Sequence, residues 1–340
     1  MSVHSLRPPS YSTAEPRPVE DPGARSFADA LHAALAQRPK RISPKWFYDE
    51  RGSELFEAIC ELPEYYPTRT ELGLLDAHAE QIAALIGPGA EVVEFGAGAS
   101  HKVRRLLDAL AKPRCYLPID ISGGHLEASI KPLRRDYPTL LVTPLAADFT
   151  QPLRLPPMAE AAQTRVGFFP GSSIGNFEPA EASALLARFA AMLRDGHGAE
   201  RARPPGLLVG VDLVKSPALL HAAYNDAAGV TAAFNRNLLA RAQRELDAGF
   251  DIEAFEHYAF YQPEQQRIEM HLLSRHAQTV QLDGRSYAFD AGESLHTERS
   301  YKYTVRQFQA LACRAGFEPA QVWCDVDQLF SLHWLTLPHA

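Results

Sequence analysis

Residues 91–100 read Glu-Val-Val-Glu-Phe-Gly-Ala-Gly-Ala-Ser, and this stretch decides the fold. Its first half has the apolar character of a buried strand, and its second half places glycines at positions 96 and 98. Glycine is required where a backbone bends sharply and lets a ligand come close. A helical pattern follows over 102–110. We therefore predict a strand, a glycine turn and a helix, with a nucleotide-like ligand at the carboxyl end of the strand.

The sequence beyond this turn alternates between strand and helix patterns. Apolar runs predict strands at 115–119, 140–146, 165–169 and 206–211, and the stretches between them predict helices over 125–137 and 180–193. Apolar strands that alternate with helices form a parallel sheet covered on both faces. The fold class that we expect is therefore α/β.

This alternation stops after Lys215. Residues 221–247 are mainly helical in pattern, and antiparallel strands are expected at 253–262, 266–275 and 279–289. A helix over 304–315 and a hairpin of 321–325 with 330–336 close the chain. Before the glycine turn, helices are expected over 26–37, 52–59 and 70–86, with an aromatic loop at 44–49.

Composition excludes several classes of protein. The chain has 340 residues, a net charge of −7 and 46% hydrophobic residues, which is typical of a globular protein and not of a disordered one. It lacks the basic excess of a nucleic-acid binder. No apolar stretch approaches the ~18 residues of a membrane-spanning helix. Residues 1–25 hold five prolines and no apolar segment of a signal peptide, so we expect a disordered tail.

The four cysteines lie far apart in the sequence and form no C-x-x-C pair. This spacing disfavours a zinc site or a disulfide framework and indicates a reducing cytoplasm. They are Cys60, Cys115, Cys313 and Cys324.

Two classes of ligand compete for the glycine turn. A dinucleotide site would have a third glycine where His101 stands. S-adenosylmethionine has no phosphate, and its sites often place an acid before the glycines, as Glu94 is here. Asp120 ends the second strand and could hold ribose hydroxyls, while Asp148 and Phe149 follow the third and could meet the adenine. Together these residues favour S-adenosylmethionine and a methyltransferase.

A second motif, Gly-Ser-Ser-Ile-Gly at 171–175, matches the G-x-S-x-G pattern of hydrolases with Ser173 as nucleophile. The next helix is expected to begin only near Pro179, and the sequence does not locate an aspartate and histidine to complete a triad. We therefore favour a loop that lines the ligand crevice, with Asn176 as a hydrogen-bonding residue.

Four longer motifs carry a resemblance to a known family. They are Phe-Tyr-Asp at 47–49, Leu-Pro-Glu-Tyr-Tyr-Pro-Thr-Arg-Thr-Glu at 62–71, Gly-Ser-Ser-Ile-Gly-Asn at 171–176 and Asp-Ala-Ala-Gly-Val-Thr-Ala-Ala-Phe-Asn at 226–235. From about residue 42 onward the chain resembles the histidine N-alpha-methyltransferases of ergothioneine biosynthesis. The resemblance implies a class I (Rossmann-like) methyltransferase sheet with an inserted α+β substrate-binding domain. It also implies three S-adenosylmethionine-dependent methylations of the L-histidine α-amine, which give hercynine.

The resemblance implies residues for each ligand. Those expected at the cofactor, together with Glu94, are Tyr48, Gly96, Gly98, Lys102, Asp120, Asp148 and Phe149. Those expected at the substrate are Tyr65, Gly171, Asn176, Tyr224, Met270, Glu298 and Ser300. The cofactor domain would comprise residues 70–214 and 302–340, and the substrate domain residues 26–69 and 215–301. We expect a cytoplasmic monomer that binds histidine and neither nucleic acid nor membrane.

The chemistry of histidine suggests roles for five of the substrate residues. Glu298 and Ser300 are two residues apart and would face the same side of an extended segment, where they could bind the imidazole nitrogens. Asn176 and Tyr224 could hold the carboxylate, with Met270 as a pocket wall. Tyr48 or a water molecule would relay protons, so Tyr48 is the expected catalytic residue, and no metal is needed.

Three alternatives stay open at this point. One is an N-methyltransferase for another aromatic amino acid or for a histidine derivative. The second is a hydrolase built on Ser173. The third is a non-enzymatic module that binds S-adenosylmethionine as a sensor.

Overall fold

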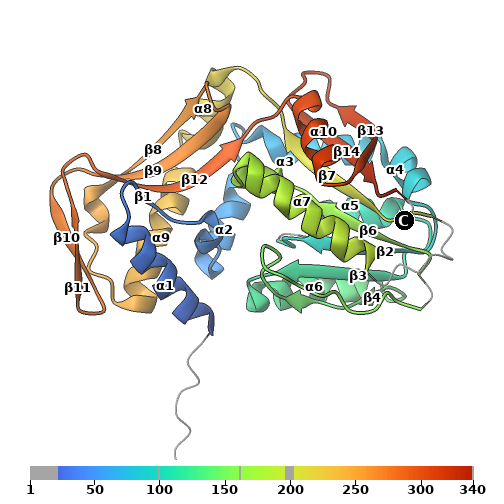
Figure 1. Ribbon diagram of the computed structural model, residues 1–340, viewed down its shortest axis with the longest axis horizontal. Helices are drawn as coiled ribbons and strands as arrows, with labels where there is room; N and C mark the ends of the chain where they lie inside the picture. Colours follow the sequence, from blue (N-terminus) through green and yellow to red (C-terminus); the bar gives the residue numbers. More distant parts are fainter. Residues whose placement is uncertain (1–21, 99, 161, 196–202, 339–340) are drawn as a thin grey trace, which may run out of the picture.

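The computed structural model describes residues 22–338, except 99, 161 and 196–202. Two sheets lie side by side along the long axis of the molecule, and helices pack on both (Figure 1). Most of the expected tail lies outside the described residues. Its last four residues, 22–25, instead begin helix α1, Pro22–Ala36. None of the described helices is both long enough and apolar enough to cross a membrane.

The larger sheet has eight strands in the order β13-β14-β7-β6-β2-β3-β4, and β5 also pairs with β3. All of its pairings are parallel except those of β14, which runs against both of its neighbours. The predicted α/β fold with a parallel sheet is confirmed. The strand bounds are β2 Ala90–Phe95, β3 Cys115–Asp120, β4 Leu141–Val142, β5 Leu145–Ala146, β6 Thr164–Phe169, β7 Gly206–Asp212, β13 Glu318–Cys324 and β14 Phe330–Thr336.

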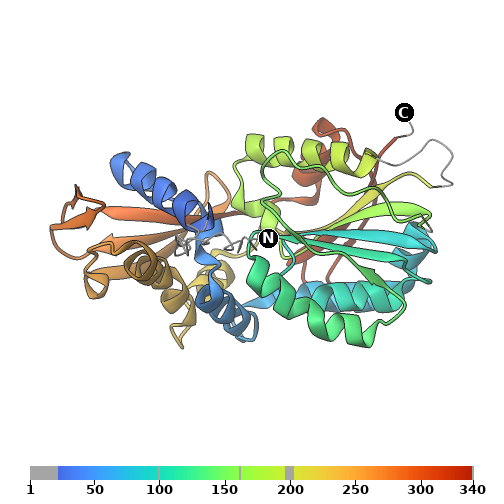
Figure 2. The ribbon, with the colours of Figure 1, turned by 90° about the horizontal axis from the view of Figure 1, so that it is seen from below.

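Helices cover both faces of this sheet, because every residue of its central strands β2, β6 and β7 is buried. Helices α7 and α10 pack on one face and α3 to α6 on the other (Figure 2). Their bounds are α3 Tyr66–Ala77, α4 Ala79–Ile86, α5 His101–Ala109, α6 Gly123–Asp136, α7 Pro179–Arg194 and α10 Val305–Arg314.

The smaller sheet has the order β1-β12-β9-β8, and a separate hairpin joins β10 to β11. Helices α1, α2, α8 and α9 share an apolar core with its inner face. Its elements are β1 Lys40–Arg41, α2 Glu50–Cys60, α8 Pro217–Tyr224, α9 Val230–Leu246, β8 Phe255–Gln262, β9 Arg267–Ser274, β10 Gln278–Leu282, β11 Arg285–Phe289 and β12 Ser294–Tyr301. Three short 3-10 helices are η1 Pro44–Phe47, η2 Ser173–Asn176 and η3 Ile252–Ala254.

The chain leaves and re-enters the larger sheet at one place. Leu213 follows β7 and forms a parallel bridge with Tyr303, which lies just beyond β12. The Tyr303 N–H also donates to the carbonyl of Asp212 at 3.1 Å. Strand β12 thus runs from the smaller sheet to the carboxyl end of β7. Helix α3 spans both cores as well, so the expected domain boundary at residue 70 falls inside a helix.

Four elements differ from the sequence-based expectations. The helix over 70–86 is divided at His78, whose ring stacks on Trp323. The strand at 140–146 is divided by Pro144, which has no N–H for the sheet. The strand at 279–289 is a hairpin that turns at Asp283 and Gly284, both with positive φ. Strand β12 was not expected, and a bulge between His296 and Glu298 interrupts its alternation.

Candidate active site

A cavity of about 1140 Å³ opens between the two sheets, where residues from the carboxyl ends of β2, β3 and β7 line it. Strand β2 lies between β3 and β6, so the strand order reverses here, the usual place for a ligand in such a sheet. Fourteen of the fifteen expected site residues line this cavity. They are Tyr48, Tyr65, Glu94, Gly96, Gly98, Lys102, Asp120, Asp148, Phe149, Gly171, Asn176, Tyr224, Glu298 and Ser300.

Met270 is the exception. It pairs with Glu298 across β9 and β12, but its side chain is 1% exposed and belongs to the apolar core of the smaller sheet. The structure therefore places it behind the cavity and not on its wall. An unbranched thioether commonly fills such a gap in a core.

The glycine turn is fixed against the end of β3. The N–H groups of Gly96 and Ala97 both donate to the carbonyl of Ile119, at 2.9 and 3.0 Å. Gly96 has a φ of +79°, a region that favours glycine, and the Phe149 ring lies beside it. Glu94 is the penultimate residue of the preceding strand and accepts a hydrogen bond from Tyr116, and burial raises its pKa to about 8.

Two carboxylates follow neighbouring strands on the far side of this turn. Asp120 accepts from the Ser122 N–H at 2.8 Å. Asp148 accepts from Thr150 twice and from Lys45 at 2.9 Å, and these donors hold its pKa below the usual range although burial opposes them. A carboxylate has about four acceptor positions, so Asp148 retains one for a ligand amine. A nucleoside with ribose hydroxyls and an exocyclic amine, as in S-adenosylmethionine, fits this donor and acceptor set.

Sequence reasoning missed a buried carboxylate under this half of the cavity. Glu71 is fully buried and accepts from the Gly171 N–H with both oxygens, at 3.0 and 2.9 Å. Lys102 forms an ion pair with it at 2.7 Å. Glu71 therefore joins the start of α5 to the loop after β6. It is the last residue of the motif at 62–71, and its membership of that motif is the one sequence signal that could have pointed to it.

Tyr48 stands between the two halves of the cavity. Asp49 caps α2 by accepting from the Gly52 N–H, and a Cβ at position 52 would lie 1.7 Å from the Phe47 carbonyl oxygen, so only glycine fits. The Tyr48 ring makes edge contacts with Phe56. Burial and the charge of Glu298 raise its pKa well above the usual value. The phenol is therefore protonated at neutral pH.

The other half of the cavity is built on β12 and η2. A Cβ at Gly175 would lie 2.7 Å from the Tyr301 carbonyl oxygen, so glycine lets η2 pack directly on the end of this strand. Asn176 ends η2 and faces the cavity with Glu298 and Ser300. Burial raises the pKa of Glu298 to about 7.

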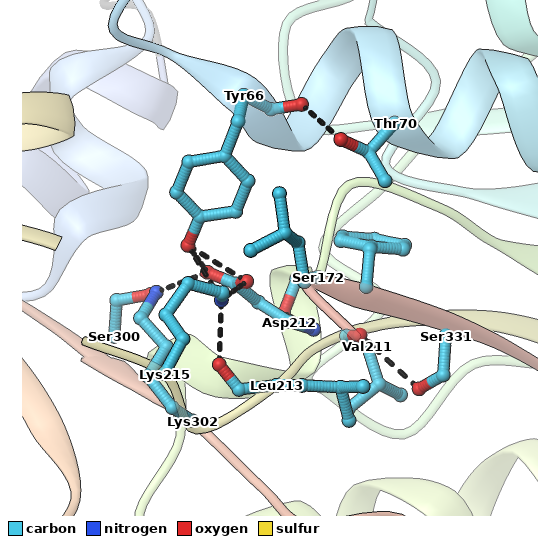
Figure 3. Close-up of polar contacts among 12 residues, drawn as sticks. Tyr66, Thr70, Ser172, Val211, Asp212, Leu213, Lys215, Ser300, Lys302 and Ser331 are labelled. Carbon is cyan, nitrogen blue, oxygen red and sulfur yellow. Dashed lines mark hydrogen bonds and ion pairs between the residues drawn. The ribbon is translucent and has the colours of Figure 1, made fainter. Parts of the chain in front are cut away.

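A charged cluster, here called the Asp212 cluster, lies at the floor of this half (Figure 3). Asp212 is 1% exposed, and it accepts from Tyr66, Lys215 and Lys302. Burial would raise its pKa, but the two ammonium groups outweigh that effect and lower it. Sequence reasoning missed this cluster, although Asp212 ends a strand as Asp120 does and Lys302 has the same i, i+2 spacing from Ser300.

Ser173 does not have the surroundings of a nucleophile. Its hydroxyl donates to the Pro170 carbonyl at 3.1 Å, and no described histidine hydrogen-bonds to it. The hydrolase alternative therefore has no support in the geometry.

Glu269, His271 and His296 are the only three residues in the described ranges whose metal-ligating atoms lie within 4.8 Å of one another. The two imidazole rings stack at 4.6 Å, an arrangement in which their in-plane lone pairs do not converge on one point. Arg267 forms an ion pair with Glu269, and His296 donates to the Glu298 carbonyl at 2.8 Å. This group holds the outer face of β9 and β12 together beside the bulge.

Residues 27–337 match the family described as histidine-specific methyltransferases that depend on S-adenosylmethionine. The chain belongs to this family. It is 40% identical over 318 residues to the histidine N-alpha-methyltransferase of Mycolicibacterium smegmatis, a match that covers 92% of this chain and 95% of that relative. It is 29% identical to ergothioneine biosynthesis protein 1 of Neurospora crassa over 87% of this chain and 33% of that protein.

Among solved structures, the CcbJ methyltransferase of Streptomyces caelestis matches with 13% identity and a TM-score of 0.44, over 77% of this chain and 95% of that chain. The fold is the expected class I methyltransferase sheet with an α+β insertion, and the chain is an S-adenosylmethionine-dependent methyltransferase.

Proposed function

We propose that this methyltransferase adds three methyl groups in succession to the α-amine of L-histidine, giving hercynine in the first step of ergothioneine biosynthesis. The observation that carries this proposal is that Glu298 and Ser300 line the same cavity as Gly96 and Asp120. One cavity would thus hold hydrogen-bonding partners for an imidazole next to acceptors for a nucleoside. The name of the relative from Mycolicibacterium smegmatis supports the same reaction.

The cofactor half would hold S-adenosylmethionine through two carboxylates. Asp120 would accept from the ribose hydroxyls and Asp148 from the adenine amine, with the Phe149 ring against the base. When bound, the cofactor supplies a methyl group on a sulfonium sulfur, which leaves as a neutral thioether. The remaining members of this half, which would shape its wall, are Tyr48, Glu94, Gly96, Gly98 and Lys102.

The substrate half would orient the amine. Asn176 and Tyr224 would donate hydrogen bonds to the carboxylate, and Glu298 would accept from an imidazole N–H while Ser300 meets the other nitrogen. Fixing both ends of the amino acid leaves its α-nitrogen one direction of approach, which is how an active site lowers the entropic cost of transfer. Tyr65 and Gly171 would complete the wall.

The α-amine must be neutral to react, so a proton has to leave before each attack. Tyr48 is protonated at neutral pH, and its phenol can pass a proton on only by accepting one as it donates its own. We assign it a relay role, shared with water, and no role as a strong base.

We also propose the wider context predicted from the sequence. All four cysteines are free, in keeping with a reducing cytoplasm. We propose a monomer that divides into a cofactor domain (70–214 and 302–340) and a substrate domain (26–69 and 215–301). Its partner is L-histidine, with no nucleic acid or membrane surface involved.

Incubation with S-adenosylmethionine and each of the twenty amino acids, followed by mass detection, tests the proposal. L-histidine alone should gain methyl groups efficiently. Preferential methylation of tryptophan, tyrosine or phenylalanine would replace histidine by another aromatic substrate. Cofactor binding without methylation of any amino acid would point to the sensor alternative.

A further inference from the structure

Lys302 connects the Asp212 cluster to two hydroxyl groups of the cavity. Its ammonium group donates to Asp212 at 2.7 Å, to the Ser300 hydroxyl at 2.8 Å and to the Tyr224 hydroxyl at 3.1 Å. An ammonium group has three protons, so these three contacts use all of them. Lys302 itself is 2% exposed.

The ammonium group is held in place and kept charged by its neighbour. Asp212 also accepts from the Tyr66 hydroxyl at 2.8 Å and from Lys215, so both of its oxygens are engaged (Figure 3). Burial lowers the pKa of a lysine, but the Asp212 charge outweighs it for Lys302 and raises that pKa. Lys302 therefore stays a donor throughout the neutral range.

A hydroxyl group has one proton and two lone pairs. Because Tyr224 accepts from Lys302, its own proton points away from the ammonium group, and the residue lines the cavity. The Ser300 hydroxyl also accepts from Lys302 and lines the cavity, and its own proton can go either to the Tyr224 oxygen or to a ligand acceptor. The positive charge next to both oxygens also disfavours a ligand donor there and favours an acceptor or an anion.

We propose that Lys302 is a positioning residue that sets the hydrogen-bond polarity of the substrate site, making Tyr224 and Ser300 donors toward the ligand. Glu298, two residues before Ser300 on the same strand, has the opposite polarity and accepts. The site would then select a ligand with acceptors at Tyr224 and Ser300 and a donor at Glu298.

This inference rests on the proposed function, because L-histidine matches that pattern. Its carboxylate supplies the acceptor for Tyr224. Its neutral imidazole has one N–H for Glu298 and one unprotonated nitrogen for Ser300, so the site would bind a single tautomer. An indole ring has an N–H and no nitrogen acceptor, and histamine has the imidazole but no carboxylate.

A simpler role for Lys302 is to balance the charge of Asp212. Lys215 separates the two roles, since it contacts the same carboxylate and is similarly buried but does not hydrogen-bond to Tyr224 or Ser300. Its remaining contacts are the Tyr66 hydroxyl and the Leu213 carbonyl. Lys215→Met is thus a matched control for Lys302→Met.

The test measures kcat and KM for L-histidine and for histamine in the wild type, Lys302→Met and Lys215→Met, with thermal melting and S-adenosylmethionine affinity as checks of folding. Wild-type turnover of L-histidine reports on the proposed function by itself. In Lys302→Met we expect KM for L-histidine to rise about ten- to hundredfold, the effect of losing one charge-assisted contact. KM for histamine should rise clearly less, because histamine can lose only the Ser300 contact to its imidazole and has no carboxylate for Tyr224 to bind. Lys215→Met should keep the wild-type ratio of the two substrates.

The inference would be overturned if KM rose equally for both substrates in Lys302→Met, or if Lys215→Met lost the same selectivity for L-histidine over histamine. Either result would leave the proposed function intact. Two further variants cover a failure of Lys302→Met to fold. Lys302→Arg retains charge and donors and should recover selectivity in part. Tyr224→Phe leaves Asp212 untouched and should reproduce the carboxylate-selective loss. A wild-type ratio in Tyr224→Phe would equally overturn the inference.

Discussion

Replacement of Glu71 by glutamine removes a charge that joins three parts of the cofactor half. Glu71 lies on α3, its partner Lys102 on the first turn of α5, and its second partner Gly171 in the loop after β6. Glutamine has the same size and keeps one oxygen for the Gly171 N–H. Its NH₂ group, however, is a donor that faces two other donors, the Gly171 N–H and the Lys102 ammonium group. The variant therefore tests the charge and not the volume of the side chain.

The loss in free energy of unfolding that we expect for Glu71→Gln follows from the burial of the ion pair. Breaking a fully buried ion pair costs about 3–5 kcal/mol. The Lys102 side chain is 17% exposed, so solvent compensates part of the loss, and we expect about 2–3 kcal/mol. At roughly 2 °C per kcal/mol for a chain of this size, the melting temperature should fall by about 4–6 °C. The affinity for S-adenosylmethionine should fall as well, because Lys102 and Gly171 both line the cavity.

Differential scanning calorimetry and titration calorimetry measure the two effects. Glu264→Gln removes the same charge from an exposed turn and serves as the control. A Glu71→Gln protein that melts and binds S-adenosylmethionine as Glu264→Gln does would refute the role assigned to Glu71.

Three further predictions concern cofactor, substrate and metal. Asp120→Ala should weaken S-adenosylmethionine binding by about 1.5–3 kcal/mol, because it removes a charge-assisted hydrogen bond to the ribose; unchanged affinity in titration calorimetry would exclude that contact. The kcat/KM for histidine should fall as the pH drops through about 7, because burial raises the Glu298 pKa to about 7 and the neutral carboxyl group accepts an imidazole N–H much less strongly than the carboxylate does. Glu298→Gln should lack that limb of the profile, and a wild-type profile in this variant would contradict the assignment. Turnover should persist in a chelator, since a sulfonium needs no Lewis acid, and loss that one divalent ion restores would contradict this expectation.

The larger sheet was predictable because its strands are short apolar runs with glycine or acidic residues at their ends. The smaller sheet was harder for reasons that individual residues show. In β12, the bulge after His296 places Thr297 and Glu298 out of the two-residue alternation, so the strand has no clear pattern. The Asp283-Gly284 turn is a strong hairpin signal that could have divided the strand expected at 279–289.

The cavity-lining residues were mostly predictable, because glycines and strand-end acids mark the ligand side of such a sheet. The buried charged residues that support the cavity wall were not predictable. Glu71, Asp212 and Lys302 are charged residues in the interior. Charged residues are mostly exposed in proteins, so sequence alone predicts that such residues lie at the surface. Only the folded structure shows that Asp212 is paired with Lys302 and Glu71 with Lys102 beside the cavity wall.

The regiochemistry of the product tests the central claim most directly. The protein is incubated with S-adenosylmethionine and L-histidine, and fragment-resolved mass spectrometry follows the products over time. The account predicts species with one, two and three added methyl groups, all on the α-nitrogen, with the trimethylated betaine accumulating last. Methyl groups on the imidazole ring, or no methylated histidine at all, would contradict it.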